Sequence, residues 1–192
     1  IHYFPNTMTH QMKNILFCIN SRMDNKFIKC ADIEDTQCVK IGLYHGIVGC
    51  IKQAKVLLSG VDPKRCDGCD AVSLGDRHQH MFLNDEKTMA YASSLISQNY
   101  GECYAHGFIV WEIQGKLVSG GFREIQNDYA HVTIEIHEKG GPIKKKNSHF
   151  SISIGEPIED MDIPRFAKIR LVLYTDQNVQ SLIDGLQKKH AD

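Results

Sequence analysis

Two cysteines and two histidines stand at a spacing that could hold a metal ion. Cys66 and Cys69 are separated by two residues, and His78 and His80 follow closely. Thiolates and imidazoles are the usual ligands of tetrahedral structural zinc. The second pair, however, is His-x-His and begins only nine residues after Cys69, which favours a loop with chance cysteines. We therefore predict no metal ligand, and keep as the alternative a structural zinc that braces this loop.

Cys103 is a candidate nucleophile. It follows Gly101 and Glu102, and His131 could take its proton, as the base does in thiol proteases. Papain-like enzymes hold such a cysteine at the N-terminus of a helix, where the helix dipole stabilises the thiolate. Cys103 instead precedes a predicted strand, so the sequence argues against a thiol protease.

The elements that would position other polar residues begin at residue 41. Residues 41–46 read as a short strand that closes on a glycine. Apolar residues at 47, 51, 54 and 58 then recur at helical spacing, which predicts an amphipathic helix over 47–58. Gly60 would end this helix, and residues 61–75 read as a loop.

A second strand and helix are expected to follow. Residues 80–83 form a short apolar run, and Asn84 could cap a helix whose first turn carries two acidic residues. Met89, Ala92 and Ile96 would supply the buried stripe of that helix. The sequence therefore repeats the order of strand and helix.

The C-terminal half reads as strands. The strongest is 108–113, followed by a turn at Gln114-Gly115, and the further segments are 122–125, 129–136, 149–154 and 167–174. The segments at 129–136 and 149–154 alternate apolar and polar residues, which favours a half-buried antiparallel sheet. A last helix is expected over 176–189. Strands and helices in this order predict an α+β fold.

Charge and composition exclude several classes of partner. The chain has 192 residues, a formal net charge of −1 and a pI near 6.9, which indicates no global attraction to nucleic acid or an anionic membrane. No run approaches the roughly 18 apolar residues of a membrane helix, and no signal peptide is visible. Seven irregularly spaced cysteines are more typical of reduced thiols than of a disulfide framework. We expect an intracellular protein, cytoplasmic or nuclear, and the missing initiator Met indicates a piece of a longer chain.

Three segments, taken in order, resemble the ADP-ribosyltransferase superfamily, and in particular the catalytic domain of poly(ADP-ribose) polymerases. The first is Leu-Tyr-His-Gly at 43–46, with Ser-Gly-Val at 59–61 after the predicted helix. The second is His-Met-Phe-Leu-Asn at 80–84, followed by Ala-Tyr-Ala at 90–92. The third, at 107–115, looks like the family's next core strand and its glycine turn. The resemblance covers residues 41 to about 117 well, and the rest of the chain loosely.

The resemblance implies a pocket that binds NAD as a substrate. The backbone of Gly46 would pair with the nicotinamide carboxamide, since glycine lets a ligand approach closely. His45, next to Tyr44, would hydrogen-bond a ribose hydroxyl, and Tyr91 would stack on the nicotinamide ring. No G-x-G-x-x-G motif follows a strand, which is consistent with this family because it binds NAD without that motif.

Two positions depart from the family pattern. The family's strand tyrosine falls on Met81, or on Phe82 if the register shifts by one residue. The family's glutamate, which stabilises charge developing on the ribose, falls on His149, and Glu135 is the alternative acidic candidate. Members without this glutamate tend to transfer a single ADP-ribose or none.

These observations lead to a set of predictions. The fold is predicted to be α+β, with an ADP-ribosyltransferase-like split, mostly antiparallel β-sheet core and flanking helices. Residues 41–192 would form this domain, and residues 1–40 an N-terminal extension packed on it. The predicted function is mono-ADP-ribosyl transfer from NAD to a protein or small-molecule acceptor, with His45, Glu135 and His149 as catalytic residues. The alternative is an inactive domain of the same fold that binds NAD, ADP-ribose or a partner protein.

Overall fold

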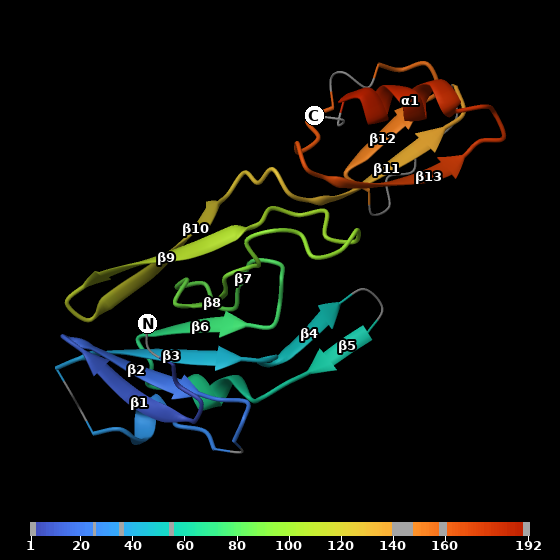
Figure 1. Cartoon of the computed structure of the whole chain (residues 1–192). Coiled ribbons are helices and arrows are strands. Elements are labelled where there is room, and N and C mark those ends of the chain that lie inside the picture. The colour runs from blue at the N-terminus through green and yellow to red at the C-terminus, as the bar shows by residue number, and fades with distance from the viewer. Residues whose placement is uncertain are drawn as a thin grey trace. The chain divides into compact units, whose positions relative to one another are not determined.

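The computed structural model describes residues 3–24, 26–34, 37–53, 56–139, 148–157 and 161–189, with only the backbone over 50–53 and 56–58. These residues form two compact units (Figure 1). Unit 1 comprises Ile1–Ser94 and His106–Glu124, and unit 2 comprises Leu95–Ala105 and Ile125–Asp192.

Unit 1 is built on a six-stranded mixed sheet in the order β1-β2-β3-β6-β8-β7. Four neighbouring strands run parallel, and the two outer strands are antiparallel to their neighbours. The core on this sheet includes Val72 and Leu74 of the central strand β6, and Tyr91 of β8. The strands are β1 (Met8–Met12), β2 (Ile15–Asn20), β3 (Val39–His45), β6 (Ala71–Gly75), β7 (Met81–Phe82) and β8 (Met89–Tyr91).

Two hairpins and two short 3-10 helices complete unit 1. β4 (Cys50–Gln53) pairs with β5 (Val56–Ser59), and β9 (Gly107–Gln114) pairs with β10 (Leu117–Glu124) through a turn at Gly115. The β9–β10 hairpin packs on the sheet, because the indole Nε1 of Trp111 donates to Ser73 Oγ at 2.8 Å. The 3-10 helices are η1 (Cys30–Asp32) and η2 (Pro63–Cys66).

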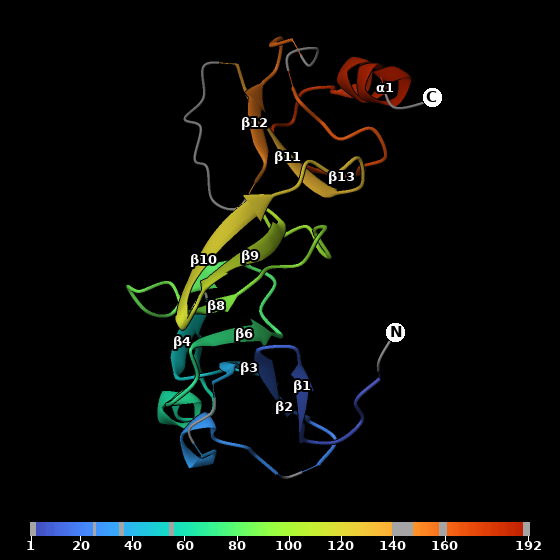
Figure 2. The same ribbon diagram turned by 90° about the vertical axis from the view of Figure 1, so that its left-hand side faces the viewer.

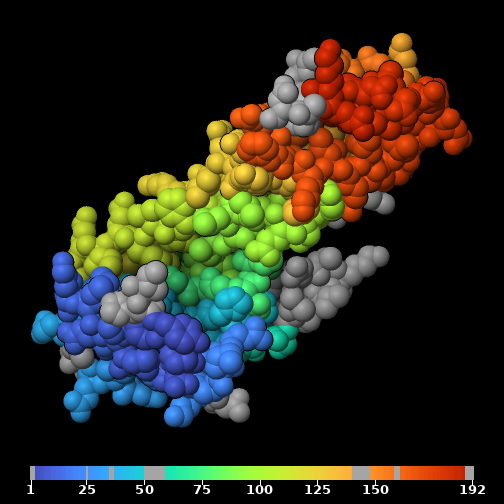
Figure 3. Space-filling model, in the orientation of Figure 1, coloured from blue at the N-terminus to red at the C-terminus, as the bar shows by residue number. Residues whose placement is uncertain are grey.

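Unit 2 is a three-stranded parallel sheet with one helix. Its order is β12-β11-β13, formed by β12 (Phe150–Ser153), β11 (His131–His137) and β13 (Lys168–Tyr174). Helix α1 (Gln180–Lys189) lies over one face of this sheet (Figure 2). Leu186 of α1 and Val179, which immediately precedes the helix, join Val132, Ile134 and Ile136 of β11 in a buried core. Figure 3 shows α1, in red, and the orange residues that precede it as one continuous body.

The predicted helix over 47–58 is wrong. Gly49 has a φ of +71°, in the left-handed region, which stops a right-handed helix in its first turn. The residues after it pair as the β4–β5 hairpin instead. The segment is rich in β-branched residues such as Ile47, Val48 and Ile51, which favour extended backbone.

The predicted helix that begins at Asn84 is also wrong. Asn84 Oδ1 accepts from the backbone N–H groups of Thr88 and Met89, so its side chain closes a tight turn into β8. Lys87 and Ser93 have φ values of 57° and 91°, which no right-handed helix contains. The same capping chemistry that can begin a helix here begins a strand.

The C-terminal elements follow the prediction closely, except for the direction of the strands. The strands expected over 108–113, 129–136, 149–154 and 167–174 are confirmed as β9, β11, β12 and β13, and the last helix as α1. The prediction of a mostly antiparallel core with flanking helices is wrong, because both larger sheets contain adjacent parallel strands. The alternation in β11 does not mark a half-buried strand, because its polar face is buried as well as its apolar face.

The predicted division at residues 40 and 41 does not coincide with any of the three points at which the chain passes from one unit to the other. β2 lies before this point and β3 ends after it, and the two strands pair along their whole length in one sheet. In the described part of the chain, no helix has the length and apolar character needed to span a bilayer.

Candidate functional site

The parallel strands of unit 1 bring polar side chains together at one edge of the sheet. Parallel strands end on the same side, so Arg22 after β2, His45 at the end of β3, and Asp76 and Arg77 after β6 share this edge. Asp76 Oδ1 lies 3.7 Å from Arg22 Nη1 and 3.9 Å from His45 Nδ1. These three side chains are partly exposed, so their mutual attraction is screened by water.

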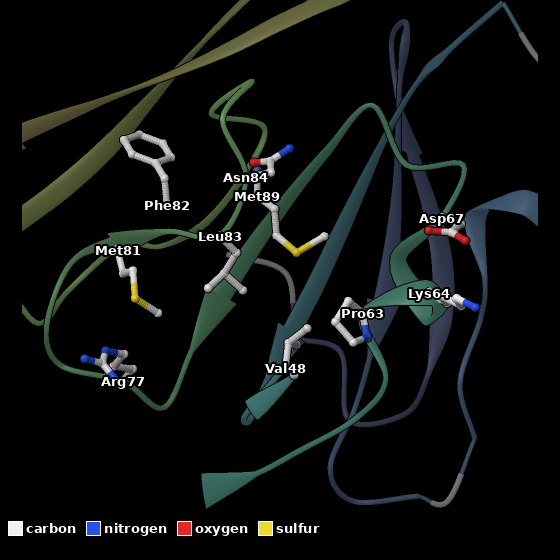
Figure 4. A pocket seen from close by; sticks show the side chains of 11 residues that line it. Val48, Pro63, Lys64, Asp67, Arg77, Met81, Phe82, Leu83, Asn84 and Met89 are labelled. Carbon is white, nitrogen blue, oxygen red and sulfur yellow. Dashed lines mark hydrogen bonds between the residues drawn. The ribbon is translucent and has the colours of Figure 1, made fainter. Parts of the chain in front are cut away.

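A pocket of about 600 Å³ opens in unit 1 (Figure 4). Its size is typical of small-molecule sites. Figure 4 shows Arg77 and Met81 on one side of the pocket and Lys64 and Asp67 on the other. The wall is largely apolar between them. The lining residues are Val48, Gly49, Pro63, Lys64, Asp67, Arg77, Met81, Phe82, Leu83, Asn84 and Met89.

Arg77 carries unused hydrogen-bond donors. Its Nη2 donates to Gln79 Oε1 at 2.9 Å. Its Nε and Nη1 are shielded from solvent and have no hydrogen-bond partner among the described residues. A shielded donor without an acceptor is costly, and more so when it belongs to a charged group. The guanidinium is therefore the polar group of this pocket with the strongest physical need for a ligand oxygen.

Tyr91 positions the wall of the pocket. Its hydroxyl donates to the carbonyl oxygen of Gly46 at 3.0 Å and accepts from the N–H of Val48 at 2.9 Å. Burial raises the pKa of this phenol, so the hydroxyl keeps its proton and remains a donor. A Cβ at Gly46 would lie 2.7 Å from the hydroxyl of Tyr44, so a larger residue there would require the Tyr44 ring to shift. Tyr91 thus anchors the loop after β3 that supplies Val48 and Gly49 to the pocket.

The predicted NAD contacts take three different positions. Met81 and Phe82 line the pocket. Tyr91 and Gly46 contact each other, as described above, but Tyr91 is fully buried, so neither face of its ring is open to a ligand. His45 is largely exposed at the sheet edge beside Asp76, and the neighbouring Tyr44 ring lies 5.6 Å from that of Phe27.

The two other predicted catalytic residues belong to unit 2. Glu135 is buried on the polar face of β11, with Oε2 3.6 Å from His137 Nε2. His149 precedes β12, and its Nδ1 accepts from the N–H of Thr133 and lies 3.4 Å from Cys103 Sγ. The predicted catalytic set is therefore divided between the units, with His45 in unit 1.

The base considered for Cys103 from the sequence was His131. That imidazole is engaged elsewhere, with Nδ1 3.0 Å from the carbonyl oxygen of Ser97. The structure places His149 beside Cys103 instead. No local signal in the sequence links Cys103 and His149, because they are 46 residues apart. The sequence also offered no signal for Arg77, which stood within an unassigned charged stretch.

The cysteines correct one expectation. Cys30 and Cys69 form a disulfide, so the prediction of reduced thiols fails for this pair. Cys69 is therefore not a thiolate ligand in this state, and Cys66 is a buried free thiol. Burial raises the pKa of Cys66 from its ordinary 9.0 to about 11, and the nearby Asp67 adds to this shift. Among the described residues, no three His, Cys, Asp or Glu side chains are grouped as a metal site requires.

Comparison with known proteins adds one relative. No protein-family model matches the chain. The sequence is 28% identical over 207 aligned positions to "Uncharacterized protein R555" of Acanthamoeba polyphaga mimivirus. The alignment covers 99% of this chain but 14% of that protein, so the chain spans a small part of the relative's length.

Proposed function

We propose that unit 1 binds an anionic nucleotide of the NAD or ADP-ribose type in the pocket beside Arg77. The single observation that carries this proposal is the pair of shielded, unpartnered donors on the Arg77 guanidinium. The pocket supports an anionic ligand with an apolar or aromatic part. The sequence resemblance to ADP-ribosyltransferases supports a nucleotide of the NAD type as that ligand. This is the binding alternative predicted from the sequence.

The charge of the pocket supports an anionic ligand. Arg77 and Lys64 each contribute a positive charge and Asp67 a negative charge, so the three ionisable lining residues sum to +1. A phosphate or carboxylate oxygen can accept from the free guanidinium donors, and such charge-assisted hydrogen bonds are stronger than neutral ones. The ligand would thereby remove the cost of leaving Nε and Nη1 of Arg77 without acceptors.

The apolar wall supports a ligand with a flat or apolar part. Phe82, Met81 and Met89 line the pocket together with Leu83. Phenylalanine can stack on a planar ring, and methionine adapts its shape to one. The amide of Asn84 is already used, because Oδ1 accepts from the backbone and Nδ2 donates to Thr88 Oγ1. Specificity would therefore depend on Arg77 and on ring packing.

Transfer of ADP-ribose remains a prediction beyond binding. Met81 and Phe82 line the pocket, and His45 ends a strand of the same sheet, whereas Glu135 and His149 belong to the other unit. The arrangement of Tyr91 does not support its role as a stacking platform. Binding is accordingly the proposal, and release of nicotinamide from NAD is measured in the same experiment.

The test compares ligands that differ in charge. Calorimetry with ADP-ribose, NAD and adenosine would be performed on the wild type and on Arg77→Gln. We expect ADP-ribose and NAD to bind measurably better than adenosine, which lacks phosphates. Losing one charge-assisted hydrogen bond worth about 1.5–3 kcal/mol should weaken ADP-ribose binding at least about tenfold in Arg77→Gln. Adenosine binding should hardly change.

Arg123→Gln is the matched control, since Arg123 is an exposed arginine of β10 in the same unit and does not line the pocket. It should bind all ligands like the wild type. Equal binding of ADP-ribose by Arg77→Gln and the wild type, or no binding by either, would contradict the proposal. Nicotinamide release that His45→Ala abolishes would extend binding to transfer.

A further inference from the structure

Cys103 and His149 form a thiol–imidazole pair within unit 2. Cys103 Sγ lies 3.4 Å from His149 Nδ1, within the distance of a sulfur hydrogen bond. Cys103 is exposed, whereas the other free thiols among the described side chains, Cys18, Cys38 and Cys66, are buried. Among the described cysteines it is thus the one that combines access for a reagent with a neighbouring proton acceptor.

The backbone sets the tautomer of His149. The N–H of Thr133 donates to Nδ1 at 3.1 Å, so Nδ1 presents a lone pair and carries no proton in the resting state. The same nitrogen faces the thiol, and the thiol proton can move to its lone pair once the Thr133 contact opens. Because protonated Nδ1 would lose the Thr133 contact, the imidazolium is a transient species rather than part of a stable ion pair.

The segment that carries Cys103 is held against the sheet by several contacts. The carbonyl of Tyr100 accepts from Thr133 Oγ1 at 3.1 Å, and the Tyr100 ring lies under the guanidinium of Arg170 at 5.0 Å. Arg170 Nη2 in turn donates to Thr133 Oγ1 at 3.0 Å. The thiol is therefore presented by a braced loop.

The face of the sheet around this pair contains unused polar atoms. Glu135 is 4% exposed and His137 is 6% exposed. Glu135 Oε2 and His137 Nε2 lie 3.6 Å apart but make no hydrogen bond among the described residues, and Ser151 Oγ makes none either. The charges of Glu135 and Arg170 both act on the Cys103 thiol: Glu135 raises its pKa and Arg170 lowers it. Buried polar atoms without partners are rare in purely structural cores.

We propose that Cys103 and His149 are the nucleophile and base of an acyl-transfer site in unit 2, with an activated acyl ester or thioester as substrate. Sγ attacks the carbonyl carbon while the thiol proton passes to Nδ1. The bond to the leaving group breaks, and the leaving oxygen or sulfur takes the proton from Nδ1. Water then attacks the resulting thioester through the same base, which releases the acid and restores the thiol. This site is independent of the nucleotide proposed for unit 1.

The charges around the pair determine the form of the resting thiol. Burial raises the pKa of Cys103, Glu135 on β11 raises it further, and Arg170 on β13 opposes these two. The resting group is therefore the neutral thiol, in contact with His149 Nδ1. Proton removal accompanies attack, so the acylation rate should rise with pH across the neutral range.

The experiment uses p-nitrophenyl acetate as the probe, on the full chain. The wild type should release one equivalent of nitrophenolate per chain rapidly, and mass spectrometry of the peptides should find one acetyl group on Cys103. Cys103→Ser should lose the rapid phase. His149→Gln should slow it by about a hundredfold, the typical contribution of a general base.

His131→Gln is the matched control, because it removes a histidine of the same unit that contacts Ser97 rather than Cys103. It should acylate like the wild type. The circular dichroism of α1 would show whether each variant retains the fold of unit 2. A rapid phase that survives in Cys103→Ser, acetyl groups found only on lysines, or equal rates in folded His149→Gln and His131→Gln would each overturn the proposal.

Discussion

The two units use parallel strands in different ways. In unit 1 the charged groups Arg22, His45 and Asp76 stand at the carboxyl ends of the strands, and the parallel strands β3, β6 and β8 are themselves largely buried. In unit 2 the polar groups stand on one face of the central strand, where Thr133 and Glu135 alternate with core residues. Alternation along one strand predicts a polar face from the sequence. A polar edge is formed by residues that follow different strands and are distant in sequence, so no local pattern predicts it.

The two units also carry separate spectroscopic probes. Trp111 is the chain's single tryptophan and belongs to unit 1. Within the described ranges, α1 is the sole α-helix, and it belongs to unit 2. Tryptophan fluorescence and helical circular dichroism during urea unfolding therefore follow the two units individually.

The largest expected effect is the loss of the Cys30–Cys69 disulfide. The bridge closes a loop with a sequence separation of 39. Freeing a loop of that length should lower the stability of unit 1 by about 4 kcal/mol. We expect reductant to shift the Trp111 transition to lower urea while the α1 transition stays in place. A Cys30→Ala/Cys69→Ala variant should already show the shifted transition and respond no further, and an equal shift of both probes would argue that the units unfold as one.

A truncated core residue in unit 2 should shift the α1 transition and leave the Trp111 transition in place, the reverse of the effect of losing the disulfide. Ile134 is fully buried in the core beneath α1. Ile134→Ala should cost about 3 kcal/mol, through lost apolar burial and the cavity left behind. The α1 transition should move while the Trp111 transition does not. Leu117→Ala is the control, since Leu117 is 77% exposed and its truncation should move neither probe.

The smallest effect is an alkaline weakening confined to unit 1. The folded pKa of Cys66, about 11, lies above its ordinary 9.0. The unfolded chain therefore loses this proton first, and the stabilisation is complete below pH 9 and lost as pH rises towards 11. The total should be on the order of 2–3 kcal/mol. Between pH 9 and 11, the urea midpoint of the transition followed by Trp111 fluorescence should fall less steeply with pH in Cys66→Ala than in the wild type. Identical pH slopes in the two proteins would exclude Cys66 as the cause.

Periodicity predicted the elements of unit 2 and failed for the helices of unit 1. In β11 and α1 the apolar spacing and the local propensity agree, so both were found. At 47–58 and 84–96 the apolar spacing is helical, but Gly49 and the side chain of Asn84 direct the backbone elsewhere. A tight turn is decided by a few atoms, and a periodicity over twelve residues does not detect them.

The candidate site was only partly visible in the sequence. Met81 and Phe82 were predicted to contact a ligand and do line the pocket. Tyr91 was predicted to stack on a ligand, but burial turned it into an anchor for Gly46 and Val48. Whether a tyrosine presents its ring or its hydroxyl depends on the segments that pack around it. For Tyr91 these include the loop with Gly46 and Val48, which is more than 40 residues away in the sequence.

The sequence by itself determined which segments are apolar, where β11 and α1 form, and which residue types are available for chemistry. The tertiary structure alone decided that strands run parallel, that Arg77 faces a pocket with free donors, and that His149 rather than His131 stands beside Cys103. The physical reason is the sequence separation over which each effect acts. Propensity and periodicity act over a few neighbouring residues, whereas strand pairing and side-chain contacts join residues tens of positions apart.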